Sequence, residues 1–179
     1  EIKGKKLAFV ATDGRRLVRC KVNLASAPND KISSARIIVP AKTMSLLQKI
    51  GNNEKDVVAV KMVDNRIIFS CANIVVSSNL VEGTFPKYED IVPSDADKKL
   101  ALSTEAVLSA VRRASLLTTE ESRGIKLAIG KDSIVFSGRA PEAGDAVVEM
   151  TIDYKGAPVE IGFNPLFLID ALRVIKTPQ

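Results

Sequence analysis

Hydrophobic and polar residues alternate along much of this chain, and the alternation predicts two sets of three strands. The first set is expected over residues 57–62, 66–71 and 74–81, and the second over residues 124–129, 133–137 and 146–153. Tight turns, Val63-Asp64-Asn65 and Gly130-Lys131-Asp132, join neighbouring runs. Each set therefore predicts an antiparallel sheet.

Three helices are predicted, each directly after a short apolar strand. The strands are expected at residues 37–39, 100–102 and 159–163, and the helices begin after Pro40, Ser103 and Asn164. Ser103 and Asn164 are typical N-caps, and Pro165 suits the first helical position. The helix starts lie 63 and 61 residues apart, which indicates a repeated β-α-β-β-β unit. Helices on one face of antiparallel sheets make an α+β fold.

Apolar residues at helical spacing are expected to contact the core. They are Val107, Val111, Ala114 and Leu117 in the second helix, and Leu168, Leu172 and Ile175 in the third. The segment 81–93 contains two prolines and a glycine and predicts a strand end followed by a linker. We expect one domain over residues 1–93 and another over residues 94–179.

Both ends of the chain predict incomplete units. A strand over residues 7–10 follows a hairpin turn at Lys3-Gly4-Lys5, so little of the preceding strand is present. The third helix ends near Thr177-Pro178 without three further strands. We expect a piece of a longer protein, in which the first domain lacks its N-terminal strand and the second lacks its C-terminal strands.

Composition adds an aliphatic core and an uneven charge. Hydrophobic residues make up 46% of the 179 residues, but only 4% are aromatic and Trp is absent. Cys20 and Cys71 lie in alternating runs, so we expect two buried, reduced thiols and a cytoplasmic protein. Residues 1–21 carry seven basic and two acidic groups, a net charge of +5 that equals the net charge of the whole chain. A basic end is typical of polyanion binding, but Lys and Arg also protect strand edges, and composition alone favours the second explanation.

Several residue patterns that support catalysis or cofactor binding are absent from the sequence. The chain has no His, no phosphate-binding glycine loop, no dinucleotide fingerprint and no Cys cluster that could bind zinc. The sequence contains the carboxylate pairs Glu89-Asp90 and Glu120-Glu121. Neither pair has a basic or nucleophilic residue at a spacing typical of a catalytic site. We therefore expect no catalytic residue, no metal and no cofactor.

Two runs are the most informative parts of the sequence, Ala11-Thr12-Asp13-Gly14-Arg15-Arg16-Leu17 and Leu80-Val81-Glu82-Gly83-Thr84-Phe85-Pro86-Lys87-Tyr88. Each places a turn-forming acid-glycine step beside apolar residues. With Glu121-Ser122-Arg123-Gly124-Ile125 and Glu160-Ile161-Gly162-Phe163-Asn164, they resemble the bacterial sliding clamp, the beta subunit of DNA polymerase III. The resemblance runs through essentially the whole chain, and four matching segments in one order are far more specific than one.

The resemblance implies a clamp fold, in which subunits form a homodimeric ring with helices lining the hole and sheets outside. It also implies that this chain corresponds to most of the second domain of a clamp subunit and to the first part of its third domain. Duplex DNA would pass through without being read, held near basic helices by salt-sensitive attraction. The residues expected to face DNA are Lys42, Lys49, Arg112, Arg113, Arg123, Asn164, Phe167 and Arg173.

The resemblance also implies one wall of a cleft that binds short peptide motifs of polymerase subunits, the clamp loader and repair proteins. The residues expected in this cleft are Thr12, Gly14, Arg15, Arg16, Leu17, Pro86, Asp90 and Ile91. Leu17, Pro86 and Ile91 would supply apolar surface. Arg15 and Asp90 depart from the family pattern, which often has His and Arg at these positions.

Two other functions stay open at this point. A generic α+β peptide-binding adaptor would share the cleft but have no DNA role. A small hydrolase or transferase would use Asp13 or Glu121, and its metal-dependent activity would be lost on Asp13→Asn. Ring formation around DNA by the parent protein separates a clamp from an adaptor.

Overall fold

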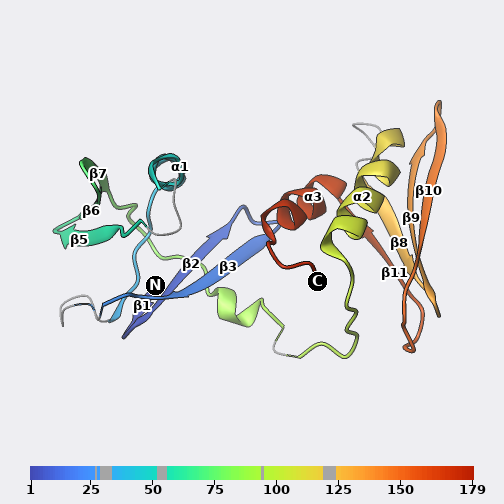
Figure 1. The fold of residues 1–179 in the computed structure, drawn as a ribbon, viewed down its shortest axis with the longest axis horizontal. Coiled ribbons are helices and arrows are strands. Elements are labelled where there is room, and N and C mark those ends of the chain that lie inside the picture. Colours follow the sequence, from blue (N-terminus) through green and yellow to red (C-terminus); the bar gives the residue numbers. More distant parts are fainter. Residues whose placement is uncertain (27, 29–33, 52–55, 94, 119–123) are drawn as a thin grey trace. The chain divides into compact units, whose positions relative to one another are not determined.

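The computed structural model describes residues 1–26, 28, 34–51, 56–93, 95–118 and 124–179. The chain divides into two compact units, unit 1 (Glu1–Val92) and unit 2 (Pro93–Gln179). Each unit combines antiparallel sheets with helices (Figure 1).

The first sheet of unit 1 is built around a long hairpin. Its strands are β1 (Ile2–Lys3), β2 (Lys6–Thr12), β3 (Leu17–Asn23) and β4 (Ser34–Ala35), in the order β3-β2-β1-β4. Gly4 has a φ of +56°, a left-handed conformation that glycine adopts without steric cost. The turn predicted at Lys3-Gly4-Lys5 is therefore confirmed.

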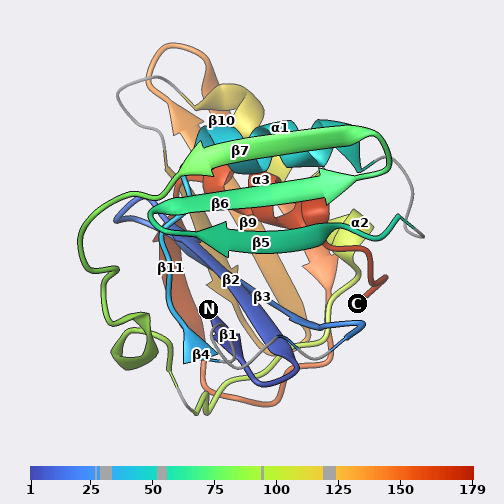
Figure 2. The ribbon, with the colours of Figure 1, turned by 90° about the vertical axis from the view of Figure 1, so that its left-hand side faces the viewer.

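The second sheet of unit 1 carries a helix on one face. Helix α1 (Ala41–Ile50) is followed by β5 (Ala59–Val63), β6 (Arg66–Cys71) and β7 (Ile74–Asn79), in the order β5-β6-β7. Ile67, Phe69 and Cys71 alternate along β6 and are buried. The buried Thr43 of α1 donates a hydrogen bond from its Oγ1 to Ser78 Oγ on β7 at 2.8 Å, and Figure 2 shows α1 running along this sheet.

Unit 2 has a four-stranded sheet and two helices. The helices are α2 (Thr104–Ala114) and α3 (Pro165–Val174), with the 3-10 turn η2 (Ser115–Leu117) after α2. The strands are β8 (Ile125–Ile129), β9 (Ser133–Ala140), β10 (Gly144–Thr151) and β11 (Val159–Phe163), in the order β10-β9-β8-β11. Its core joins buried residues of α2, including Val111, to Ile125, Phe136, Val148 and Ile169 of β8, β9, β10 and α3.

The two four-stranded sheets have the same connectivity, and each leads into a helix. β1, β2, β3 and β4 correspond to β8, β9, β10 and β11, and α1 and α3 follow in the same place. The helices begin at Ala41, Thr104 and Pro165, with the predicted spacing of 63 and 61 residues. The predicted helix spacing is confirmed, and so are the three strands after α1 and after α2, but the predicted strand before the helix is present only at β11.

Four details of the prediction were wrong. Residues 37–39 and 100–102 form no strand, and Leu100 and Leu102 instead pack against the core of unit 2. Cys20 is exposed because its face of the β2–β3 hairpin is uncovered, as the exposure of its register partner Phe9 and of Val18 and Val22 shows, whereas Cys71 is buried as predicted. Ile175 caps the end of α3 and is 46% exposed, so it is not a core contact.

Candidate functional site

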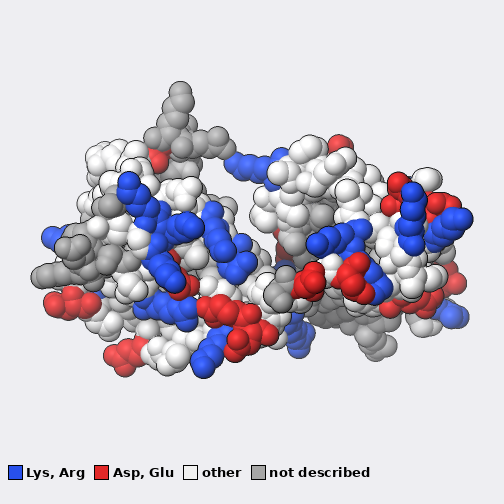
Figure 3. Space-filling model, turned by 90° about the horizontal axis from the view of Figure 1, so that it is seen from below, with Lys and Arg blue, Asp and Glu red and all other residues white. Residues whose placement is uncertain are grey.

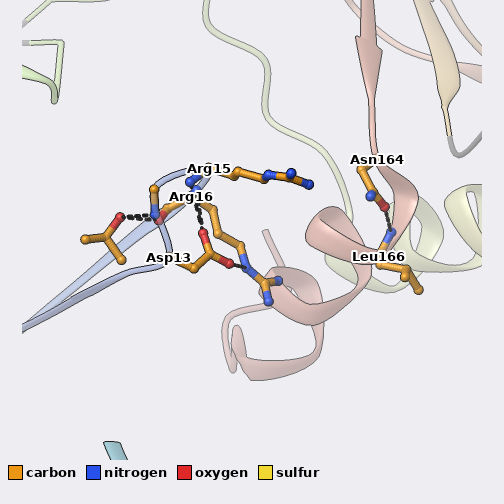
Figure 4. Close-up of polar contacts among 7 residues, drawn as sticks. Asp13, Arg15, Arg16, Asn164 and Leu166 are labelled. Carbon is orange, nitrogen blue, oxygen red and sulfur yellow. Dashed lines mark hydrogen bonds and ion pairs between the residues drawn. The ribbon is translucent and has the colours of Figure 1, made fainter. Parts of the chain in front are cut away.

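The turn between β2 and β3 is the best-defined part of the candidate peptide site (Figure 4). Asp13 Oδ1 accepts hydrogen bonds from the backbone amides of Arg15 and Arg16 at 3.1 and 3.0 Å. Thr12 Oγ1 donates to the Arg16 carbonyl at 2.8 Å and accepts from the Gly14 amide at 3.1 Å. Gly14 has a φ of +83°, which a turn tolerates best with glycine.

These contacts explain the electrostatics of the turn. The backbone hydrogen bonds from Arg15 and then Arg16 lower the pKa of the Asp13 carboxyl below its ordinary value, because they stabilise the charged form. Arg16 Nε also contacts Asp13 Oδ2 at 3.0 Å. The carboxylate therefore shapes the turn, and the side chain of Arg15 stays exposed.

A second group of candidate residues lies at the 3-10 helix η1 (Tyr88–Asp90). The buried Tyr88 donates a hydrogen bond from its hydroxyl to Glu1 Oε2 at 2.9 Å and packs edge-on against Phe85. Arg36 Nη2 donates to Glu1 Oε1 at 3.2 Å and also to Glu89 Oε1. The hydrogen bond from Tyr88, together with Arg36, lowers the pKa of the Glu1 carboxyl.

This anchoring leaves the neighbouring candidates free to contact a ligand. Pro86 and Asp90 are exposed, and Ile91 is 66% exposed although it follows a buried Tyr88. Single exposed aliphatic side chains are common on protein surfaces, so the exposure of Ile91 makes it available to a ligand without marking a site by itself. Leu17, the first residue of β3, is half-buried.

Both groups lie on one face of the β3-β2-β1-β4 sheet. Glu1 and Ala8 exchange two backbone hydrogen bonds of 2.8 Å, so they are directly opposite and share a face. Ala8 and Thr12 share that face because side chains alternate along a strand, and Leu17 is the register partner of Thr12. Glu1, which holds Tyr88, and Leu17 therefore lie on the same side. The hydrogen bonds described here hold each group together but do not join the two groups.

The helices carry most of the other candidate residues. Lys42 and Lys49 are exposed and lie two turns apart on α1, away from the buried Thr43. Arg112 and Arg113 are exposed in the last turn of α2, and Arg173 is exposed in the last turn of α3. Cations in a last turn also complement the helix dipole, which is a purely structural reason for the three arginines.

Asn164 and Phe167 have structural partners. Asn164 caps α3, because its Oδ1 accepts the amide hydrogen of Leu166 at 3.0 Å (Figure 4). Phe167, in the first turn of α3, is half-buried. Arg123 lies outside the described residues.

The sequence did not single out Glu1, Arg36 or Tyr88 as site residues. They are 35 to 87 residues apart along the chain, and only the folded sheet brings them together. Tyr88 offered one signal, because it lies beside the Phe85-Pro86 step in one of the two most informative runs.

Comparison with known proteins decides the family. Residues 1–87 match the family model for the central domain of the DNA polymerase III beta subunit, and residues 89–179 match the model for its C-terminal domain. The chain belongs to the DNA polymerase III beta subunit family. The resemblance seen in the sequence is thereby confirmed.

Curated sliding clamps match nearly the whole chain. The chain is 34% identical to the clamp of Caulobacter vibrioides over 174 residues, or 97% of the chain and 46% of that protein. It is 32% identical to the clamp of Pseudomonas putida over 179 residues, or 100% of the chain and 48% of that protein. The chain spans about half the length of the curated relatives it matches.

Solved clamp structures confirm the α+β clamp fold. A sliding clamp from Pseudomonas aeruginosa superposes with a TM-score of 0.89 at 32% identity, covering 99% of this chain and 48% of that one. A clamp from Bartonella birtlesii bound to griselimycin gives a TM-score of 0.87 at 33% identity, covering 97% of this chain and 46% of that one. No helix in the described part of this family member is long and apolar enough to cross a membrane.

Proposed function

We propose that the parent protein of this chain is a non-catalytic DNA sliding clamp of the bacterial cytoplasm. It encircles duplex DNA as a homodimeric ring and tethers the replicative polymerase for processive synthesis. The match of both domain models, in order, is the observation that supports this most. Residues 1–93 would form most of the second clamp domain and residues 94–179 the first part of the third.

The DNA-facing surface is proposed to be the exposed basic side of the helices. Lys42 and Lys49 on α1 and Arg112 on α2 are exposed and, among the described residues, have no ion-pair partner. Such cations attract phosphates without reading bases, which suits a ring that slides. Arg113, Arg123, Asn164, Phe167 and Arg173 complete the proposed surface.

Salt dependence of DNA binding by the full-length parent tests this surface. Lys42→Ala, Lys49→Ala and Arg112→Ala should each reduce the slope of log affinity against log salt by roughly 0.9, the value for one lost phosphate contact. Lys131→Ala, in an exposed hairpin turn of the described structure, is the control. Unchanged slopes in all three variants would remove the helices from the DNA surface, and sequence-specific binding would contradict the clamp function.

We further propose that the turn and the η1 segment form part of a cleft for client peptides of polymerase subunits, the clamp loader and repair proteins. Leu17, Pro86 and Ile91 would bury apolar client side chains, and Thr12, Gly14 and Arg16 would shape the rim with Arg15 and Asp90. A related clamp binds the ligand griselimycin, which supports a binding site in this family.

Titration of a labelled peptide rich in Leu and Phe against the full-length parent tests the cleft. Burial of one apolar side chain contributes about 1.5–3 kcal/mol, so Leu17→Ala should weaken binding by roughly one such contribution. Val75→Ala, an exposed aliphatic side chain on β7, is the control. An unchanged affinity for the folded Leu17→Ala protein would mean that Leu17 is ordinary surface.

A further inference from the structure

Four basic residues lie on one face of the β3-β2-β1-β4 sheet. Lys3 is the register partner of Lys6, and Lys6 is the partner of Asn23, so these three share a face. Arg19 and Lys21 precede Asn23 by four and two residues on β3, so they point to the same side. We name Lys3, Lys6, Arg19 and Lys21 the basic track. All four are exposed, and Figure 3 shows Lys and Arg gathered on a face of this unit.

Protection of sheet edges does not explain this arrangement. Lys3 and Lys6 belong to β1 and β2, which are interior strands of the sheet. Like charges directly opposite each other on neighbouring strands are destabilising. Edge protection by Lys and Arg therefore accounts only for the two residues on β3.

The cations of the basic track are not neutralised within the described structure. None of the four has an ion-pair partner among the described residues. Glu1 lies on the same face, but Arg36 and Tyr88 hold its carboxylate. The surface therefore retains a net positive charge that an anionic partner would complement.

The basic track begins beside the proposed client cleft. Leu17, Arg19 and Lys21 occupy alternate positions of β3 and face the same way. Alternate side chains along a strand repeat at about 6.6–6.8 Å, and an extended peptide presents its own alternate side chains at the same repeat. A peptide whose apolar side chain meets Leu17 can thus bring two acidic side chains to Arg19 and Lys21.

We propose that Arg19 and Lys21 of the basic track bind the acidic flank of a client peptide whose apolar residue docks against Leu17. The client class is a Leu- or Phe-containing segment with Asp or Glu at the two alternate positions that follow the apolar anchor. This inference rests on the proposed cleft and adds a basis for choosing among clients. Exposed charge pairs add little affinity each and are screened by salt, so the track acts chiefly on selectivity.

The test compares two labelled peptides on the full-length parent at low salt. Both carry the same Leu-Phe anchor, one with Asp and Glu at alternate flanking positions and the other with Asn and Gln there. The acidic peptide should bind roughly two- to tenfold more tightly, as expected for two exposed charge pairs. Arg19→Ala combined with Lys21→Ala should abolish this preference and leave the affinity for the neutral peptide unchanged.

A matched control replaces Lys61 and Arg66, an exposed basic pair on one face of the β5-β6-β7 sheet, with Ala. This variant loses the same net charge and should keep the preference. If both variants lose the preference for the acidic peptide equally, only net charge matters and the proposal is overturned.

Two further measurements separate the remaining outcomes. If Leu17→Ala weakens both peptides but they bind the parent equally, the cleft stands and the basic track fails. If Leu17→Ala weakens neither peptide, the proposed cleft itself fails. The affinity of the double variant at Arg19 and Lys21 for a short DNA duplex should also be measured. If the variant loses as much affinity for the duplex as for the acidic peptide, the track is a nucleic-acid surface and the peptide assignment is overturned.

Discussion

Single residues in this chain fix local geometry through contacts that the backbone itself makes. Asp13 accepts hydrogen bonds from two backbone amides. These bonds hold the turn in a conformation that Gly14 makes possible. Gly138 in unit 2 acts through the absence of a side chain, which leaves room for β9 to approach the end of α2. Each residue therefore makes a separable contribution that a substitution can measure.

The β2–β3 turn should depend on pH in the acid range. Because the pKa of Asp13 is lowered on folding, its hydrogen bonds should persist above the folded pKa and be lost as pH falls through it. The amide shifts of Arg15 and Arg16 in NMR spectra should titrate with a midpoint below that of an ordinary aspartate, about 3.9. Asp13→Ala should remove this titration, and a midpoint at or above the ordinary value would contradict the described hydrogen bonds.

Gly138→Ala should destabilise unit 2. A Cβ at Gly138 would overlap the carbonyl oxygen of Ala114 and lie 3.1 Å from Thr118 Cγ2, and a backbone carbonyl cannot move aside as a flexible side chain would. Overpacking of this kind costs about 1–3 kcal/mol of unfolding free energy, measurable by urea denaturation. Gly162→Ala, where a Cβ would meet nothing within 4 Å, is the control and should change stability much less.

Helix starts are the elements whose sequence signals were most direct. Ser103 accepts the amide hydrogen of Ala106, and Asn164 accepts that of Leu166, with Pro165 at the first helical position. Each signal lies within a few residues of the atoms that it satisfies. A local pattern of this kind survives any rearrangement of distant parts of the chain.

Substitutions at Asn164 should separate its capping role from its proposed DNA role. Asn164→Ala should cost about 1 kcal/mol of stability, whereas Asn164→Asp should keep the cap because Asp caps helices as well as Asn does. If Asn164 faces DNA, the Asp variant of the full-length parent should also bind duplex DNA more weakly. Equal DNA affinity for the parent and the Asp variant would leave Asn164 with the capping role alone.

The sequence predicted what is local and missed what depends on pairing. Strand β6 (Arg66–Cys71) was predicted with its observed bounds, because its alternation is strict and a turn precedes it. Residues 37–39 were wrongly predicted as a strand, because β-branched residues do not reveal whether a partner strand exists. The turn at Asp13 was recognisable from its Asp-Gly step, whereas the contact of Tyr88 with Glu1 spans 87 residues and leaves no local signal.

At the scale of the whole chain, the two units differ in the depth of their cores. The largest fully buried side chains among the described residues, Phe136, Ile125, Ile134 and Val111, all belong to unit 2. Unit 1 buries Ile67 and Phe69 at 3% and 6% exposure. Exposed aliphatic side chains do not separate the units, because Val75 of unit 1 and Val147 and Val174 of unit 2 are all more than half exposed.

Hydrogen exchange should distinguish the two units within this chain. Amides of β8 and β9 should exchange more slowly than those of β2 and β3, because burial of apolar side chains stabilises a region against local opening. Mass spectrometry of peptic fragments would measure both regions in one sample. Faster exchange in β8 and β9 than in β2 and β3 would contradict this ranking.

The different surroundings of the two thiols make the chain suitable for selective chemical labelling. Cys20 is exposed on β3, directly opposite Phe9, while Cys71 is buried at the end of β6. A maleimide dye should therefore react at Cys20 and spare Cys71 as long as the protein stays folded. The dye would lie on the face of β3 opposite Leu17 and the basic track, so it could report on that strand by fluorescence without blocking either surface.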